Sequence, residues 1–380
     1  MPICSGVDAN TGSGIEIGFD ETIRSVRAAA ERPSLWVAPG WVDIQVNGFA
    51  GVDYNAPAAP QDEIARSIHA LHATGVTHFY PTVITGAPED MVAALRNLAR
   101  AKESLEEGGA MDGFHVEGPH ISPDDGPRGA HPKRWVRPPN IDEFHRWQEA
   151  AGGHIRLVTL APEWGDAPRY IEAVVGENVV VSIGHTAAEA QHIADAVSAG
   201  ATMSTHLGNG AHGVLRRHPN YIWEQLAEDR LRASFIVDGI HLPKSFLKVG
   251  LRAKGVERAV LVTDATSPAG CPPGRYRLGE QEVDLTPDNR VVLAGQERLA
   301  GSALRMDRGV ENLMRLGELS LADAIKLATV NAARAGRVPG REAGLTPGQR
   351  ADFVFFDFDP ASQSLQVNAT YVGGRKVWSL

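Results

Sequence analysis

Five residues suited to metal or proton chemistry stand at or just beyond the ends of short apolar runs. They are Glu117, His185, His206, His241 and Asp264. If the runs are parallel strands of an α/β barrel, their carboxyl ends meet at one face, which is where such barrels carry their active sites. One carboxylate, several histidines and a later aspartate at that face could support hydrolysis assisted by a bound metal ion.

Glu117, His185 and His206 are the candidate metal ligands. A catalytic Zn²⁺ uses about three protein ligands plus water, and it prefers imidazole nitrogen and carboxylate oxygen. A lone histidine at a strand end is most often a structural residue, but three candidate ligands at three strand ends favour a metal site. We expect one divalent ion, Zn²⁺ first, because Fe²⁺, Co²⁺ and Mn²⁺ accept the same ligands.

Three further residues could act on a substrate. Asp264 is expected to take a proton from the attacking water and to return it to a leaving amine. His131 follows the third predicted strand and could donate a hydrogen bond to a carbonyl oxygen that gains negative charge. His241 could orient a polar group of the substrate. The alternatives are a turn or N-cap role for Asp264 and ordinary loop positions for the two histidines.

The first predicted strand is informative because it lacks histidine. Many metal-dependent barrel hydrolases carry His-x-His there and bind a second metal, whereas this chain has Gln45 and Asn47. Neutral amides are poor ligands for Zn²⁺ compared with imidazole. We therefore predict one metal, with the amides filling the second position and bonding each other or the catalytic water.

The elements that must position these residues alternate along the chain. Eight apolar runs read as strands buried on both faces, and segments such as 62–75 and 187–200 between them have helical spacing and end in Gly. The alternation favours a parallel sheet closed into a (β/α)8 barrel. The eight runs are residues 41–47, 77–83, 113–118, 155–162, 179–185, 201–207, 231–239 and 259–265.

The two ends of the chain have a different pattern. Short alternating segments broken by Gly and Pro predict a small β-sandwich domain built from residues 1–38 and 343–380, which leaves 39–342 for the barrel. Residues 282–295 predict a hairpin inserted after the eighth strand.

Composition narrows the class of protein. The 380 residues have a net charge of −9 with no basic run, so we expect a small-molecule substrate and no nucleic acid. No apolar stretch reaches the roughly 20 residues needed to cross a membrane, and the first residues do not read as a secretory signal. Cys4 and Cys271 are far apart, which favours structural thiols and a cytoplasmic protein.

Several motifs together resemble the N-acetylglucosamine-6-phosphate deacetylase family of the amidohydrolase superfamily. The resemblance is collinear over nearly the whole chain. Its segments are residues 38–55, 114–132, 182–186, 205–210, 236–242, 261–270 and 299–313, with HVEGP, GHT and TDATSPAG the most specific in combination.

The resemblance implies roles for individual residues. Glu117, His185 and His206 match the metal ligands, and Asp264 matches the proton shuttle. His131 matches the histidine that polarises the amide carbonyl, His241 one that contacts the sugar or its phosphate, and Asn209 with Gly210 a segment that meets the substrate. Gln45 and Asn47 match the single-metal branch. The resemblance also implies a homodimer with the site near its interface.

One segment departs from the family pattern. Arg217 aligns with a phosphate-binding arginine, but His218 replaces an acidic residue and Asn220 replaces glycine. The departure keeps an unphosphorylated or different N-acetyl amino sugar open as the substrate. Another amidohydrolase acting on an N-acyl compound or cyclic amide is a second alternative, and a barrel without activity that serves as a sugar sensor or scaffold is a third.

Overall fold

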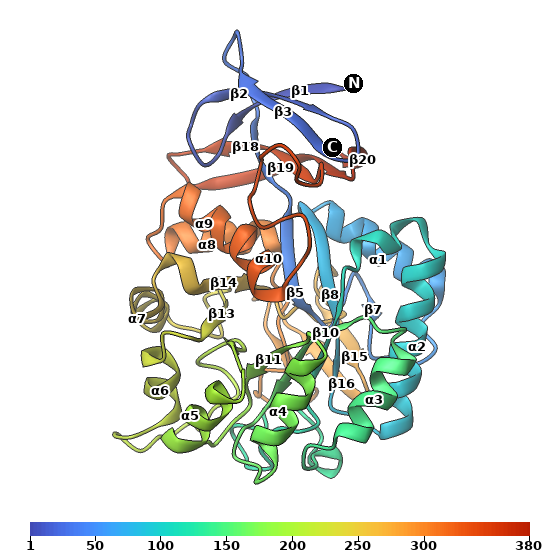
Figure 1. Cartoon of the computed structure of the whole chain (residues 1–380), viewed down its shortest axis with the longest axis vertical. Coiled ribbons are helices and arrows are strands. Elements are labelled where there is room, and N and C mark those ends of the chain that lie inside the picture. Colours follow the sequence, from blue (N-terminus) through green and yellow to red (C-terminus); the bar gives the residue numbers. More distant parts are fainter.

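A computed structural model describes residues 1–380, and its central element is a closed barrel of eight parallel strands (Figure 1). The strands are β5 (Trp41–Val46), β8 (Val76–Ile84), β9 (Phe114–Glu117), β10 (Ile155–Leu160), β11 (Val180–Ile183), β12 (Met203–Ser204), β13 (Arg232–Ile236) and β14 (Ala259–Val262). Neighbours in the barrel follow this order, and each strand overlaps one of the eight predicted runs. The last and first strands meet where the Asp264 N–H donates to the Gln45 carbonyl at 3.0 Å, which closes the barrel.

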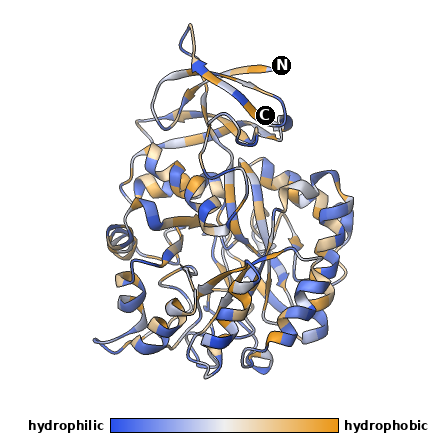
Figure 2. Ribbon diagram, in the orientation of Figure 1, coloured by the Kyte–Doolittle hydropathy of each residue, from blue (hydrophilic) through white to orange (hydrophobic).

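Burial on both faces explains why the strands are apolar. Side chains such as Ile44, Val180 and Val262 fill the barrel interior, while a larger core of 72 buried residues lies mainly between the strands and the helices. Figure 2 shows the barrel strands largely in the colours of hydrophobic residues. Continuous burial removes the alternation seen in sheets with one wet face, as is usual for parallel sheets.

Helices surround the barrel in the alternating order that the sequence predicts (Figure 1). They are α1 (Gln61–His72), α2 (Pro88–Ser104), α3 (Ile141–Ala150), α4 (Ala167–Gly176), α5 (Ala190–Ser198), α6 (Tyr221–Ala227), α7 (Lys244–Lys254), α8 (Met306–Arg315), α9 (Leu321–Ala328) and α10 (Val330–Gly336). Three short 3₁₀ helices are η1 (Glu106–Ala110), η2 (Lys133–Trp135) and η3 (Val256–Arg258).

Both ends of the chain contribute to one seven-stranded mixed sheet, in the order β20-β19-β18-β4-β1-β2-β3. Its strands are β1 (Ile3–Asp8), β2 (Gly14–Phe19), β3 (Ile23–Ala28), β4 (Trp36–Pro39), β18 (Phe353–Asp359), β19 (Ser364–Val372) and β20 (Arg375–Ser379). Two strands separate β2 from β18, yet the rings of Phe19 and Phe353 lie 5.0 Å apart. The sheet therefore curves over its own small core, and β4 leads directly into the first barrel strand.

A three-stranded antiparallel sheet is inserted after the last barrel strand. It consists of β15 (Gly274–Leu278), β16 (Gln281–Leu285) and β17 (Val291–Leu293). The predicted hairpin is present as β16 and β17, and β15 is an additional strand. Leu278 and Val283 pack with Ile84, the last residue of β8, so the inserted sheet covers part of the carboxyl end of the barrel. A two-stranded ribbon, β6 (Gly48–Phe49) and β7 (Val52–Asp53), follows β5.

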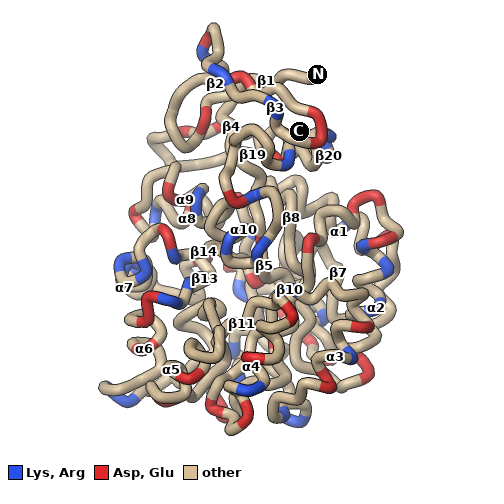
Figure 3. Tube along the Cα trace, in the orientation of Figure 1, with Lys and Arg blue, Asp and Glu red and all other residues tan.

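The surface carries interspersed charges. Figure 3 shows acidic and basic residues alternating over the outer helices and the terminal sheet. None of the helices combines the length and the apolar composition that a membrane span requires.

Candidate active site

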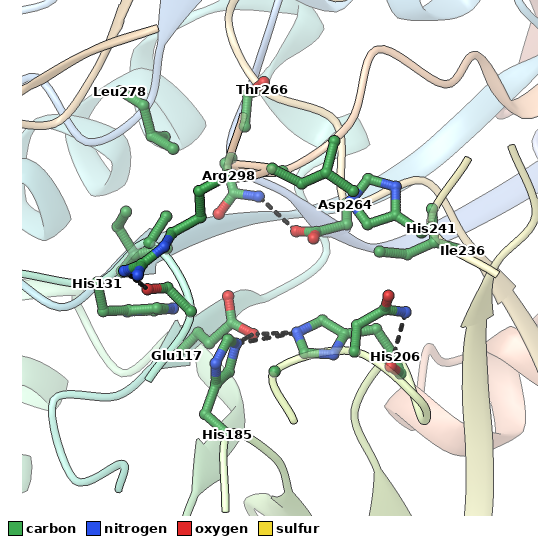
Figure 4. A pocket seen from close by; sticks show the side chains of 18 of the residues that line it. Glu117, His131, His185, His206, Ile236, His241, Asp264, Thr266, Leu278 and Arg298 are labelled. Atoms are coloured by element: carbon green, nitrogen blue, oxygen red, sulfur yellow. Dashed lines mark hydrogen bonds and ion pairs between the residues drawn. The ribbon is translucent and has the colours of Figure 1, made fainter. Parts of the chain in front are cut away.

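The predicted chemistry-bearing residues do converge at the carboxyl end of the barrel. His185, His206 and Asp264 follow β11, β12 and β14 within two residues, and their φ angles are +50°, +30° and +50°. Residues other than glycine rarely adopt this left-handed backbone conformation, and the positions where they do so cluster at functional sites. The strained turns end the strands abruptly and place these three side chains around one cavity (Figure 4).

Glu117, His185 and His206 form a compact buried group. The Glu117 Oε1 atom lies 2.9 Å from the His206 Nε2 atom and 3.2 Å from the His185 Nε2 atom, and the two nitrogens are 3.1 Å apart. One ligand atom from each residue thus points to a common centre, which Figure 4 shows between the three side chains. This donor set of two imidazoles and one carboxylate fits a divalent ion.

The surroundings of His185 prepare its Nε2 atom for a metal. Its Nδ1 atom lies 2.8 Å from the carbonyl oxygen of Pro127. A carbonyl only accepts, so Nδ1 carries the proton and the Nε2 lone pair faces the cluster, an arrangement that orients metal-binding histidines in general. A Cβ atom at Gly210 would lie 2.6 Å from the His185 Nδ1 atom, so only glycine fits beside the ring.

The charges of the cluster also favour a cation. Burial alone would raise the pKa of Glu117, but hydrogen bonds and charges from His185 and His206 outweigh it and hold that pKa well below its usual range. Burial and the nearby Glu117 charge raise the pKa of Asp264 to about 6. Two carboxylates are thus buried together, and no arginine or lysine forms an ion pair with either of them. Buried carboxylates without arginine or lysine partners are costly unless the histidines carry protons or a metal balances the charge.

The two amides of β5 are hydrogen-bonded to the carboxylates. Asn47 Nδ2 donates to Asp264 Oδ1 at 2.7 Å, and Gln45 Nε2 lies 3.2 Å from the same oxygen and 3.0 Å from Glu117 Oε1. The amides therefore bond the carboxylates rather than each other, and the alternative that they bond the catalytic water stays a prediction. Amide N–H groups can thus hold the two nearby carboxylates in place.

His131 and His241 both face the cavity with one ring nitrogen already bonded. The His131 Nδ1 atom lies 2.8 Å from the Thr85 hydroxyl, and burial with the neighbouring His185 lowers the His131 pKa to about 3. His131 is therefore neutral at pH 7. The His241 Nδ1 atom lies 2.6 Å from Asp238 Oδ2, which leaves its Nε2 atom for the cavity.

The cavity above these residues has a volume of about 310 Å³, which suits a small molecule. Asn209 and Gly210 line its wall, as predicted for substrate-binding residues, and the Asn209 Nδ2 atom donates to the His206 carbonyl at 3.1 Å. Thr266, Leu278 and Arg298 also line it, and the sequence analysis did not select them.

Two predicted site residues, Gln45 and Arg217, do not line the cavity. Gln45 still contacts the site through Glu117 and Asp264, whereas Arg217 lies apart from it. Arg217 is exposed and lies beside a separate groove formed with Leu215, Trp223 and Phe246. The substitutions noted after His206 therefore change a loop whose arginine lines a different groove of this chain.

The barrel and this site define the class of protein. The chain belongs to the amidohydrolase family, whose sequence model matches residues 36–377. It is 35% identical over 339 residues to the N-acetylglucosamine-6-phosphate deacetylase of Bacillus subtilis (strain 168), covering 88% of this chain and 83% of the relative. It is 34% identical over 331 residues to the N-acetylgalactosamine-6-phosphate deacetylase of Escherichia coli O157:H7, which covers 87% of this chain and 86% of the relative.

A solved structure agrees with these relatives. A mutant N-acetyl-D-glucosamine-6-phosphate deacetylase from Mycobacterium smegmatis, in complex with N-acetyl-D-glucosamine-6-phosphate, matches with a TM-score of 0.89 and 30% identity over 99% of both chains. The resemblance to the N-acetylglucosamine-6-phosphate deacetylases that the motifs indicate is therefore confirmed, as is the barrel with a sheet from both termini.

Proposed function

We propose that this protein hydrolyses the N-acetyl group of N-acetylglucosamine-6-phosphate to give glucosamine-6-phosphate and acetate. The observation that carries the proposal is the buried group of Glu117, His185 and His206, with Asp264 beside it, at the base of a cavity sized for a small molecule. The names of the similar proteins supply the substrate.

Glu117, His185 and His206 are the residues that would hold one divalent ion, and we propose Zn²⁺. Such an ion polarises a carbonyl oxygen and lowers the pKa of a coordinated water. Gln45 and Asn47 keep the site to a single ion, because each directs an amide N–H at a carboxylate oxygen where a second cation would sit.

Asp264 is proposed to move the proton. Its carboxylate takes one proton from the attacking water, and the resulting hydroxide attacks the acetyl carbon. When the carbon–nitrogen bond of the tetrahedral intermediate breaks, Asp264 returns the proton to the departing amine. The buried position and the pKa of about 6 suit a carboxyl group that must both accept and release a proton near neutral pH.

His131 is proposed to stabilise the oxyanion. The Thr85 hydroxyl can donate to the His131 Nδ1 atom, which would leave the proton on Nε2, and that N–H can then donate to the acetyl oxygen as negative charge develops. His241, Asn209 and Gly210 are proposed to orient the sugar from the cavity wall. We also propose a cytoplasmic homodimer, as the sequence analysis predicts.

The relative named N-acetylgalactosamine-6-phosphate deacetylase favours a second candidate substrate that differs only at C4 of the sugar. The test is acetate release by Zn²⁺-loaded protein from the two N-acetylhexosamine-6-phosphates and from free N-acetylglucosamine. The proposal expects the highest kcat/KM on N-acetylglucosamine-6-phosphate. A higher value on the galacto sugar or on the free sugar would replace the substrate, and no acetate from any of them would refute deacetylation.

A further inference from the structure

One loop of the candidate active site both contacts a metal ligand and carries His131. The loop spans residues 124–131, between β9 and η2, and its Pro127 carbonyl lies 2.8 Å from the His185 Nδ1 atom. A Cβ atom at Gly129 would lie 3.2 Å from the His185 ring, so the loop packs closely against the cluster. A shift of the loop would therefore displace the proposed oxyanion donor and disturb a candidate metal ligand.

Side chains of the inserted sheet hold this loop by its main chain. Gln281 Nε2, at the start of β16, donates to the Ala130 carbonyl at 2.5 Å. Arg298 Nη1, beyond β17, donates to the Gly129 carbonyl at 3.3 Å, and Figure 4 shows this arginine beside His131. Ala130 also packs against the apolar core of the sheet. The two residues that precede His131 are thus both bound by the inserted segment, with the shorter hydrogen bond coming from Gln281.

Gln281 is fixed to the barrel independently of the loop that it holds. It follows a tight turn in which Gly279 has a φ of +57° and donates its N–H to Asp53 Oδ2 at 2.5 Å. The Ser267 hydroxyl donates to the Arg277 carbonyl, also at 2.5 Å. Asp53 belongs to β7 and Ser267 follows β14, so the turn is tied to the carboxyl end of the barrel at two points.

The Gln281 side chain does not reach the substrate cavity. The residue is half-buried, it is absent from the lining of the catalytic cavity, and its side chain donates only to the Ala130 carbonyl. Any effect of Gln281 on the reaction must therefore pass through the loop. Such support matters because a misplacement of about 1 Å in a catalytic group can lower the rate by about 10²-fold.

We propose that Gln281 is a positioning residue for His131, because it holds the Ala130 carbonyl and so fixes where the His131 ring lies. The proposal rests on the deacetylase function above and adds to it a residue that does not contact the substrate. The Thr85 hydroxyl bonds Nδ1 and leaves Nε2 of His131 for the acetyl oxygen, while Gln281 keeps that nitrogen in reach. The inserted sheet then supports the catalytic loop as well as covering part of the barrel end.

The first test is Gln281→Met, which keeps a side chain of similar length and removes the N–H donor. We expect kcat on N-acetylglucosamine-6-phosphate to fall about tenfold, the effect of losing one neutral hydrogen bond. KM should stay within about twofold, because His131 acts on charge that develops in the transition state. Gln296→Met is the matched control, since Gln296 is exposed in the same inserted segment and lies outside the cavity, and it should behave as wild type.

A double variant separates positioning of His131 from a general effect on the site. In the His131→Asn background, Gln281→Met should lower kcat by less than about twofold, because the residue through which it acts is already gone. The same tenfold loss in both backgrounds would overturn the proposal, as would a kcat of Gln281→Met equal to that of wild type.

Hydrogen exchange gives a second readout that does not require activity. The Gly129 and His131 N–H groups bond within the loop at 2.9 and 3.2 Å, and they should exchange about tenfold faster in Gln281→Met, whereas the amides of β10 should not change. Unchanged exchange in the loop would refute the role of Gln281 even if kcat fell. If wild type releases no acetate, the deacetylase function fails, and the exchange still decides whether Gln281 holds the loop.

Discussion

Two buried groups of histidine and carboxylate lie at opposite ends of the same barrel, and their charges are balanced in different ways. At the carboxyl end, Glu117 contacts His185 and His206, and Asp264 lies nearby without any ion pair to arginine or lysine. At the amino end, His78 lies 2.6 Å from Asp112 Oδ2 and 2.8 Å from Asp352 Oδ2.

The amino-end group is completed by the protein itself. Arg341 Nη1 lies 2.8 Å from Asp352 Oδ2, and Arg350 lies 3.3 Å from both Asp112 and Asp352. Burial would raise the pKa of Asp352, but His78 and Arg341 outweigh it and hold that pKa far below its usual range. The cluster joins β8 of the barrel to the segment before β18, so it fastens the terminal sheet to the barrel.

The difference separates a structural role from a catalytic one. Both groups are buried and both contain histidine, so residue type and burial do not distinguish them. The amino-end group has two arginines, whereas the carboxyl-end group has no arginine or lysine partner and opens into a cavity of about 310 Å³. A buried negative charge that the chain does not neutralise is the feature that indicates a metal site.

The largest expected effect is that of His185→Ala. Removing one of three ligands should empty the metal site and abolish acetate release, while the fold persists because the residue lies in a loop at the cavity. Elemental analysis of the purified variant checks the first result and circular dichroism the second. Full metal occupancy in this variant would refute the ligand assignment.

Asp264→Asn should lower kcat by about 10²- to 10⁴-fold, the usual range for a general acid–base residue. The amide cannot accept the proton from water, but it keeps nearly the same size and can still pack against Asn47. Metal content should stay at the wild-type value, which separates this variant from His185→Ala. Turnover close to that of wild type would exclude Asp264 as the proton shuttle.

Asp352→Asn tests the other end of the barrel. It should lower the free energy of unfolding by about 3–5 kcal/mol, because His78 and Arg341 would lose a buried partner. At denaturant concentrations below its unfolding transition, the variant should have the metal content and kcat of wild type. Chemical denaturation with parallel acetate assays measures both, and a large loss of kcat in folded protein would show that the two ends are coupled.

The smallest expected effect is a pH dependence of stability from His78. The paired carboxylates raise the pKa of His78 above its usual 6.5 despite burial, so its stabilising contribution is complete below pH 6.5 and is lost as the pH rises through the folded-state pKa. For one proton the free energy of unfolding changes by about 1.4 kcal/mol per pH unit in that window. The measurement is the difference in unfolding free energy between wild type and His78→Gln from pH 5 to 9, a range of about 4 units. A difference that does not vary with pH would contradict the charged state of His78.

The barrel and its main site residues could be predicted because one local pattern carries both. Each apolar run indicates a buried strand. The polar residue that ends the run, such as Glu117 or His185, must then lie at the carboxyl end of the barrel. That inference needs only the order of residues along the chain. The eight strands follow from this pattern, whereas the terminal sheet follows from a different one, the short alternating segments broken by Gly and Pro at both ends of the chain.

The remaining features depend on contacts between distant segments. Strand β15 has mostly exposed, polar residues, so the sequence of residues 274–278 lacks an apolar signal. Arg298 lies in an exposed loop and reaches the cavity only because the inserted sheet folds over the barrel end. His78 has no local sign of its carboxylate partners, since Asp352 is 274 residues away in the chain.

The most direct test of the central claim is a metal titration of chelated protein followed by acetate release from N-acetylglucosamine-6-phosphate. The comparison of the two clusters predicts that the chelated protein stays folded but inactive, and that binding of one Zn²⁺ per chain restores full turnover. Full turnover in the metal-free protein, or a requirement for two ions per chain, would contradict it.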